Sequence, residues 1–286
     1  MRIFLAGASG AIGRRLVPML VAAGHEVTGT ARTDRGEELL RAQGATPVRV
    51  DVFDADALLR AVGEAAPDVI IHQLTALATG GPAENARLRR HGTENLVKAA
   101  KAAGVNRIVA QSISWVYAAG DEPATEDTPL DLDAPEPRAT TIGGVRALET
   151  SVAEIDEWVV LRYGMLYGPG TWYASDGRIA DQVRAGKLRA TDAVTSFLHV
   201  DDAAAAAVQA LSWPTGAYNI VDDEPASARE WLPVYAAALG APPVATESGR
   251  AGWERGASNR TARERLGWRP LHPSWRTGFA ASLADG

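Results

Sequence analysis

The sequence contains no cysteine among its 286 residues. Disulfide bonds, thiolate nucleophiles and cysteine-ligated metal sites are therefore excluded. No spacing of histidine, aspartate and glutamate in the sequence is typical of a metal site either. A cysteine-free chain suits a reducing compartment, so we expect the protein to act in the cytoplasm.

An excess of positive charge and long apolar runs are also lacking. The formal net charge is −6, which argues against general binding of nucleic acid. No stretch approaches the ~18 uninterrupted apolar residues that a membrane span needs. Because the sequence opens directly on a strand-like segment, we expect no signal peptide. These absences favour a small molecule as the partner, rather than nucleic acid or a membrane.

The most informative motif present is Gly7-Ala-Ser-Gly10-Ala-Ile-Gly13. A short apolar segment, 1–6, precedes it and predicts a strand, and Arg14–Gly24 predicts a helix. Glycine permits a positive φ in a tight turn, and the N–H groups at a helix start attract an anion. Strand, glycine-rich turn and helix in this order predict a phosphate cradle.

Apolar strands alternate with helices through the first 110 residues. After the first strand we expect strands at Val27–Thr30, Thr46–Val50, Asp68–Ile71 and Arg107–Ala110, with helices at Gly36–Ala42, Ala55–Ala65 and Ala83–Ala103. This alternation predicts an α/β fold, a doubly wound parallel sheet of the Rossmann type. Ligands bind such sheets at the carboxyl ends of the strands.

The rhythm stops at an acidic, proline-rich segment, 120–137, which predicts a loop. This loop is either a solvated flap or a lid that repels anions. A helix at Thr141–Ile155 and strands at Trp158–Leu161 and Ala217–Val221 then continue the sheet. We expect a cofactor-binding domain over 1–167, which also receives segments near 197–221. A smaller substrate-binding lobe is expected mainly over 168–286.

Motifs along nearly the whole chain resemble those of the extended short-chain dehydrogenase/reductase family, which includes nucleotide-sugar epimerases and dehydratases. In chain order the matching segments are the Gly7, Gly10, Gly13 triplet, Asp51-Val52, Gly92–Leu96, Val116-Tyr117, Leu166–Pro169, Phe197–Asp202, Gly216–Asn219 and Leu266–Pro270. The resemblance implies a Rossmann fold, a nicotinamide dinucleotide cofactor and a homodimer formed through the helices expected near 83–103 and 141–155. The cofactor contacts that it implies are Gly7, Ser9, Gly10, Ala11, Ile12, Gly13, Arg32, Asp51, Val52, Leu74, Thr75, Ala76, Ser112 and Tyr163.

The residues after the second strand bear on the choice of coenzyme. An acidic residue there accepts hydrogen bonds from the ribose hydroxyls of NAD, whereas a basic one binds the 2′-phosphate of NADP. In this sequence Arg32 stands there and the first acid is Asp34. We therefore expect Arg32, with Arg35 as a second basic residue, to favour NADP(H), with NAD(H) as the alternative.

The sequence departs from the family in its catalytic residues. The family uses a tyrosine as proton donor, and a lysine four residues later lowers the pKa of its phenol and binds the nicotinamide ribose. Aligning Glu149 with the glutamate that commonly follows this lysine places Thr141 at the tyrosine and Val145 at the lysine. A threonine hydroxyl is too weak an acid for this task, and valine carries no charge.

Other residues then become candidates for handling the proton. The family's catalytic serine or threonine aligns with Ile113, which has no hydroxyl and is flanked by Ser112 and Ser114. We expect Ser112 to take the role, with a turn hydroxyl as the alternative. Tyr117 matches a position beside the substrate. Catalytic candidates are therefore Tyr117, Ser112 and, by its position alone, Thr141. Weaker candidates, each with an ordinary structural role as its alternative, are His72, Tyr163, Tyr167, Tyr173 and His199.

We expect an atypical NADP(H)-dependent oxidoreductase that acts on a small or medium organic substrate. The proton is handled outside the usual tyrosine and lysine, and orientation of substrate and nicotinamide supplies much of the rate. Two alternatives stay open. The same pocket serves a non-redox isomerisation, elimination or cyclisation, or the protein senses NADP(H) without catalysis.

Overall fold

The computed structural model describes residues 1–76 and 81–284. Its strands are β1 (Arg2–Ala6), β2 (Glu26–Ala31), β3 (Thr46–Arg49), β4 (Val69–His72), β5 (Arg107–Ile113), β6 (Glu157–Tyr163), β7 (Met165–Tyr167), β8 (Val194–Thr195), β9 (Phe197–His199), β10 (Gly216–Ile220) and β11 (Ala226–Ser227). Its helices are α1 (Gly13–Ala22), α2 (Asp34–Ala42), α3 (Ala55–Ala65), α4 (Pro82–Arg87), α5 (Thr93–Ala102), α6 (Arg138–Val152), α7 (Arg178–Arg184), α8 (Val200–Gln209), α9 (Ala228–Ala238), α10 (Arg260–Arg265) and α11 (Trp275–Ala284). A π-helical segment, η1 (Leu88–Gly92), and a 3-10 segment, η2 (Ala210–Ser212), complete them.

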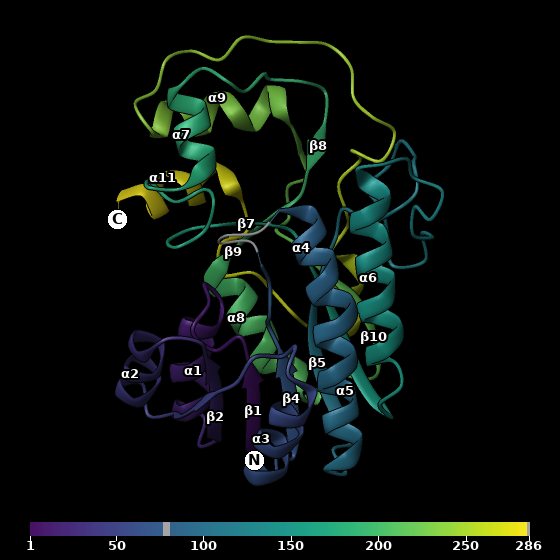
Figure 1. Ribbon diagram of the computed structural model, residues 1–286. Coiled ribbons are helices and arrows are strands. Elements are labelled where there is room, and N and C mark those ends of the chain that lie inside the picture. Colours follow the sequence, from purple (N-terminus) through teal and green to yellow (C-terminus); the bar gives the residue numbers. More distant parts are fainter. Residues whose placement is uncertain (77–80, 285–286) are drawn as a thin grey trace. The chain divides into compact units, whose positions relative to one another are not determined.

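The main sheet within the described residues has the strand order β10-β6-β5-β4-β1-β2-β3 (Figure 1). Strand β1 pairs in parallel with both β2 and β4, and the pairs β2–β3 and β4–β5 are parallel as well. Residues 3–6 of β1 are all buried, as expected of a strand covered on both faces. The predicted α/β fold of the Rossmann type is confirmed, and the strand order reverses beside β1, where such sheets bind ligands.

The chain divides into two compact units, each assembled from separate segments of the sequence. The first unit comprises 1–112, 132–161 and 204–217, and the second comprises 113–131, 162–203 and 218–286. In this division 204–217 group with the first unit, whereas 113–131 and 162–167 group with the second. The core of the first unit includes Phe4, Ile70, Leu96, Ile108 and Leu148.

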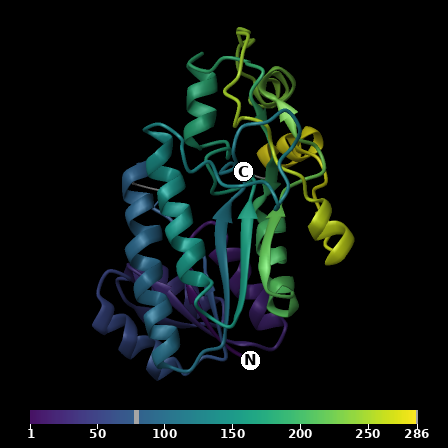
Figure 2. The same ribbon diagram turned by 90° about the vertical axis from the view of Figure 1, so that its right-hand side faces the viewer.

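Helix α6 lies side by side with α4 and α5 in both views (Figures 1 and 2). A Cβ atom at Gly144 of α6 would lie 2.9 Å from the Cβ atom of Ala86 in α4, so only glycine permits this approach. The single helix expected over 83–103 is wrong in one respect, because η1 separates α4 from α5. A π-helical turn widens the helix, and such turns occur frequently at functional sites.

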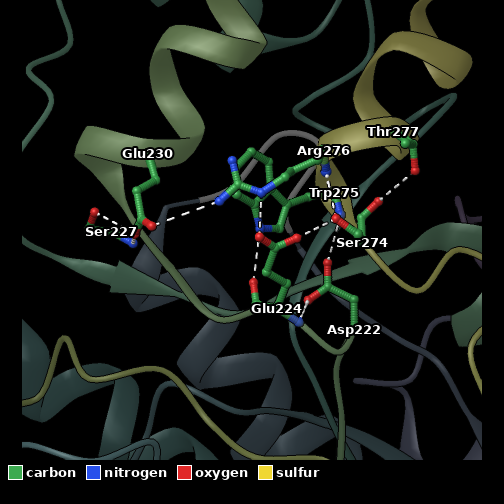
Figure 3. Close-up of polar contacts among 8 residues, drawn as sticks. All are labelled: Asp222, Glu224, Ser227, Glu230, Ser274, Trp275, Arg276 and Thr277. Carbon is green, nitrogen blue, oxygen red and sulfur yellow. Dashed lines mark hydrogen bonds and ion pairs between the residues drawn. The ribbon is translucent and has the colours of Figure 1, made fainter.

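The second unit has an aromatic core, and a polar network holds its C-terminal helix. Tyr167, Tyr173, Phe197, Trp231, Tyr235, Trp275 and Phe279 belong to that core. The carboxylate of Asp222 accepts the backbone N–H groups of Trp275, at 3.0 Å, and Glu224, at 3.3 Å (Figure 3). Glu224 in turn binds the guanidinium of Arg276 and the hydroxyl of Ser274. Burial raises the pKa of Asp222 to about 8. Burial thus disfavours the charged form of this carboxyl group, and the hydrogen bonds from the two N–H groups offset part of that free-energy cost.

The start of the expected acidic loop is anchored within the second unit. The guanidinium of Arg255 binds the backbone carbonyl groups of Ala118 and Glu122. Glu126 accepts the backbone N–H of Asn219 at 2.8 Å and the hydroxyl of Thr261 at 2.8 Å. These contacts anchor 118–126, and much of the segment 120–137 is exposed, as expected of a solvated surface loop.

Asp222→Ala removes the acceptor of two backbone N–H groups, of which that of Trp275 is buried. We expect the free energy of unfolding to fall by about 2 kcal/mol, because a buried N–H group without an acceptor has given up its hydrogen bond to water and gained none in the protein. Urea denaturation followed by circular dichroism measures this change. The matched control is Asp176→Ala, since Asp176 is exposed in the same unit. Equal stability of the two variants would contradict the anchoring role of Asp222.

Candidate functional site

The glycine-rich turn joins β1 to α1 by very close backbone contacts. Gly7 has a φ of +92°, and a Cβ atom there would lie 2.7 Å from the carbonyl carbon of Gln73. A Cβ atom at Gly13 would lie 2.3 Å from the carbonyl oxygen of Gly7. The N–H of Gly10 donates to the carbonyl oxygen of Gly7 at 3.1 Å. The first turn of α1 is therefore pressed against the end of β1, and this cradle fits a pyrophosphate at the N-terminus of the helix.

A cavity of about 130 Å³ lies beside this turn, at the carboxyl ends of the central strands. Its lining residues are Gly7, Ser9, Gly10, Thr30, Ala31, Arg32, Val50, Asp51, Val52, Phe53, Gln73, Leu74, Thr75 and Leu88. The cavity thus brings together most of the residues expected to contact the cofactor. Three expected contacts at or just before the start of α1 lie outside this lining, namely Ala11, Ile12 and Gly13. Ala76 also lies outside it, and its N–H donates to Asn85 Oδ1 at 3.1 Å.

Two charged side chains line this cavity, Arg32 after β2 and Asp51 after β3. Asp34, the first acid after β2, binds the guanidinium of Arg49, which also holds Glu37 at 2.5 Å. Hydrogen bonding to Arg49 lowers the pKa of both acids. Asp34 is therefore engaged by Arg49, whereas Arg32 is exposed at the cavity.

The two residues that our alignment places at the family's tyrosine and lysine, Thr141 and Val145, lie on α6. Thr141 is half-buried, and Val145, one turn later, is fully buried. Glu149, a further turn along, accepts the hydroxyl of Ser112 at 2.7 Å. Strand β5 continues through Ser112 to Ile113, past the expected end at Ala110. Ser112 is only 3% exposed. Glu149 orients its hydroxyl, a contact that was not expected from the sequence, where Glu149 served only to align this helix with the family.

Tyr117 lies in the second unit, where it is 1% exposed. Its hydroxyl donates to Asn219 Oδ1 at 2.5 Å and accepts from Arg162 Nη1 at 2.9 Å. Arg162 and Asn219 were missed because each is far from Tyr117 in the sequence. Tyr163, in the same unit, donates its hydroxyl to the carbonyl oxygen of Ala203 at 3.0 Å.

Buried polar groups surround the ends of β4 and β5 in the first unit. His72 Nδ1 accepts the N–H of Leu74 at 3.2 Å, so Nε2 carries the proton and donates to the hydroxyl of Thr93 at 2.8 Å. Burial, and secondly the charge of Arg89, lowers the pKa of His72 to about 4. This neutral imidazole therefore has the structural role, and its fixed hydrogen bonds leave no free base.

Arg89 was also missed by our sequence analysis, because a cation on a helix is usually exposed. Arg89 is 5% exposed. Burial lowers the pKa of its guanidinium to about 10, and the negative charge of Glu149 opposes this shift. At neutral pH the guanidinium is still charged. Arg89 therefore introduces a buried cation between the end of β4 and α6.

The structure also brings His199, Asp202 and His272 together, with one ligand-type atom of each within 4.8 Å of the others. The carboxylate oxygens of Asp202 accept the N–H groups of Leu271 and His272 at 2.6 and 3.0 Å. The two ring nitrogens of His199 contact the N–H of Asp201 and the hydroxyl of Ser282, at 3.2 and 3.1 Å. These contacts give the cluster a role in holding the C-terminal segment.

The remaining candidates, Tyr167 and Tyr173, lie in the aromatic core of the second unit. Burial raises the pKa of both phenols far above the ordinary value for tyrosine. Trp172 lies 4.0 Å from the guanidinium of Arg178 in a cation–π contact. These residues support packing rather than proton transfer.

A model of the NAD-dependent epimerase/dehydratase family matches residues 3–221. The chain belongs to this family. It is 48% identical to the 3-diazoavenalumate denitrifying reductase of a Streptomyces species, over 98% of this chain and 99% of that one. It is 31% identical to the 2-alkyl-3-oxoalkanoate reductase of Stenotrophomonas maltophilia, over 85% of this chain and 77% of that one.

Solved structures of the family have the same fold. The Bordetella bronchiseptica enzyme WbmG, in complex with NAD and UDP, superposes with a TM-score of 0.79 at 26% identity, over 99% of this chain and 94% of that one. The Thermus thermophilus UDP-glucose 4-epimerase, in complex with NAD, gives 0.76 at 25% identity, over 99% and 98%.

Together these relationships identify an NAD(P)-dependent oxidoreductase or epimerase/dehydratase-like enzyme with a nicotinamide cofactor. The glycine cradle and the cavity beside it fit such a cofactor. In the described part of the chain, no helix has the length and apolar character to cross a bilayer.

His72 predicts a specific loss of stability in acid. Its pKa of about 4 in the folded protein lies below the unfolded value near 6.5, so the stabilisation is present above pH ~6.5 and is lost as the pH falls toward ~4. We expect the free energy of unfolding of the wild type, relative to His72→Gln, to fall by about 3 kcal/mol between pH 7 and pH 4. Urea denaturation across this range measures the difference.

The matched control for this experiment is His91→Gln, because the side chain of His91 is 55% exposed. Its difference from the wild type should stay nearly constant with pH. A constant difference for His72→Gln as well would show that His72 is not held neutral by burial.

Proposed function

We propose that this enzyme is an NADPH-dependent reductase that replaces the diazo group of an aromatic carboxylate by hydrogen and releases dinitrogen. The proposal extends to this chain the activity named for its 48% identical relative, which matches it along almost its whole length. We place the reaction in the cytoplasm on the ground of the cysteine-free sequence, and dimerisation through α4, α5 and α6 remains a prediction.

The composition of α6 is the observation that carries this proposal. Reduction of a ketone adds a hydride to carbon and requires a proton on oxygen, which a tyrosine with a nearby lysine supplies in related enzymes. In this chain Thr141 and Val145 stand at those positions, and neither donates a proton at neutral pH.

Reductive removal of a diazo group needs no such acid. When bound, the reduced coenzyme supplies a hydride, which is two electrons and a hydrogen nucleus. In the net reaction of an aryl diazonium ion, the C–N bond breaks, a C–H bond forms and N₂ leaves as a neutral molecule. The positive charge of the diazonium and the negative charge of the hydride cancel, so no external proton enters the balance. A site without a proton donor is therefore suited to this chemistry.

Within this proposal the protein binds and orients the reactants. Glu149 fixes the Ser112 hydroxyl at the end of β5, where a substrate near the nicotinamide would meet it. Orientation alone supplies a large part of the rate when the reacting atoms are held in contact.

The preference for NADPH is supported by the charges at the cavity. Arg32 lies in its lining, and Asp34 is engaged by Arg49. An arginine at the end of the second strand binds a 2′-phosphate by charge-assisted hydrogen bonds, which NADH does not provide.

A second candidate function is reduction of a ketone with Tyr117 as proton donor. One observation favours it: Arg162 donates to the phenol oxygen of Tyr117 at 2.9 Å, so a cation adjoins this hydroxyl. The 31% identical relative is named a 2-alkyl-3-oxoalkanoate reductase, which is a reductase of a keto acid.

The proposed reaction predicts equal amounts of N₂ and oxidised coenzyme. Incubation with NADPH and a ¹⁵N-labelled diazo derivative of a hydroxycinnamate-type acid should release ¹⁵N₂ at one equivalent per NADPH consumed, measured by mass spectrometry and absorbance. The control is Gly10→Val, which adds a side chain in the cradle and should reduce the rate to the uncatalysed background. Failure to release labelled nitrogen, together with oxidation of NADPH by a 3-oxo acid that Tyr117→Phe abolishes, would favour the second candidate.

Arg32→Ala should weaken NADPH binding about tenfold or more and leave NADH binding nearly unchanged, because only NADPH carries the 2′-phosphate. Isothermal titration calorimetry measures both dissociation constants. The matched control is Arg60→Ala, an exposed arginine on α3 of the same unit. Equal losses for the two coenzymes would refute the assignment of Arg32 to the 2′-phosphate.

A further inference from the structure

Arg89 is a buried cation with unused hydrogen-bonding capacity. It is 5% exposed, and within the described residues its guanidinium makes no hydrogen bond and no ion pair. A guanidinium presents several N–H donors and remains charged at neutral pH. Burial of such a group is costly unless hydrogen bonds compensate it, so its donors are available for a ligand.

The local structure directs Arg89 toward the nicotinamide half of a bound dinucleotide. It lies in η1, whose first residue, Leu88, lines the cofactor cavity. Thr93, directly after η1, holds His72 at the end of β4. η1 also packs against α6, where Glu149 holds Ser112 near the end of β5. The segment that carries Arg89 is therefore associated with the ends of β4 and β5.

The two halves of a dinucleotide lie on opposite sides of the position where the strand order reverses. Arg32 and Asp51 follow β2 and β3, on the side that takes the adenosine. Strands β4 and β5 lie on the other side of β1, which takes the nicotinamide and its ribose.

We propose that Arg89 binds the hydroxyl groups of the nicotinamide ribose and so replaces the lysine that Val145 has displaced. Helix α6 carries Val145 one turn before Glu149, and η1 packs against α6. The positive charge and the hydrogen-bond donors thus reach the same region from η1 rather than from α6. Glu149 balances the added charge. This assignment rests on the proposed coenzyme-dependent function and names a positioning residue for it.

Calorimetric titration of the complete protein tests the assignment without any substrate. Arg89→Met should raise the dissociation constant of NADPH about tenfold or more, whereas Arg89→Lys should restore part of the affinity. The affinity for 2′,5′-ADP, which lacks the nicotinamide half, should stay within about twofold of the wild type. NADH and ADP, titrated in parallel, give the same comparison without the 2′-phosphate. Arg90→Met is the matched control, because Arg90 is the exposed neighbour in η1.

Unchanged affinity of Arg89→Met for both coenzymes would overturn the assignment. Equal losses for the whole coenzyme and its adenosine fragment would overturn it too, because they indicate a purely structural role. If Arg89→Met shows no cooperative thermal transition, Arg89→Gln carries the same expectation. Since no diazo compound is present, a failure of the proposed reduction leaves this result interpretable on its own.

Discussion

The contact between Gly13 and the carbonyl oxygen of Gly7 is the constraint on which the cofactor site depends. Any side chain at position 13 would enter the backbone of the preceding turn. The same turn approaches the backbone of Gln73 after β4, so neither Gly7 nor Gly13 has room for a Cβ atom. Because β1 is central in the sheet, this packing sets where α1 begins and where its N–H groups point. Arg32, Asp51 and Leu74 reach the same cavity only because their strands end beside that turn.

The polar groups near the ends of β4 and β5 form a second level of organisation. His72 is neutral and fully hydrogen-bonded, Ser112 is oriented by Glu149, and Arg89 supplies charge. Under the proposed alignment, which puts Thr141 and Val145 at the family's catalytic positions, this rigid, polar and partly charged site lacks the usual proton donor. The proposed hydride transfer, in which N₂ leaves as a neutral molecule, needs no such donor.

The fold could be predicted from the sequence, and so could the gathering of several expected cofactor residues around one cavity. The glycine triplet and the alternation of strands and helices are local patterns, and parallel strands bring their carboxyl ends to one edge. Gly7, Arg32 and Asp51 therefore came together as expected. The predicted positions of the strand ends were less accurate, since β5 continues past Ala110 to Ile113.

Contacts between distant residues could not be predicted in this way. Ser112 meets Glu149 across 37 positions, and Asp202 accepts from His272 across 70. No local pattern in the sequence predicts such a pair. The π-helical turn at η1 leaves no clear trace in the order of apolar residues, so nothing in the local sequence marks Arg89 as buried. Tyr117 was identified by its motif, but its partners Arg162 and Asn219 depend on tertiary structure.

The burial of Val145 limits which side chains this position of α6 can carry. A lysine at this position would place an ammonium group where the side chain is now fully enclosed, in the helix against which the segment of Arg89 packs. Two neighbouring cations in a poorly hydrated place repel each other strongly. A Val145→Lys substitution would therefore need compensating changes in η1 as well as in α6, because an enclosed space accepts one cation far more readily than two.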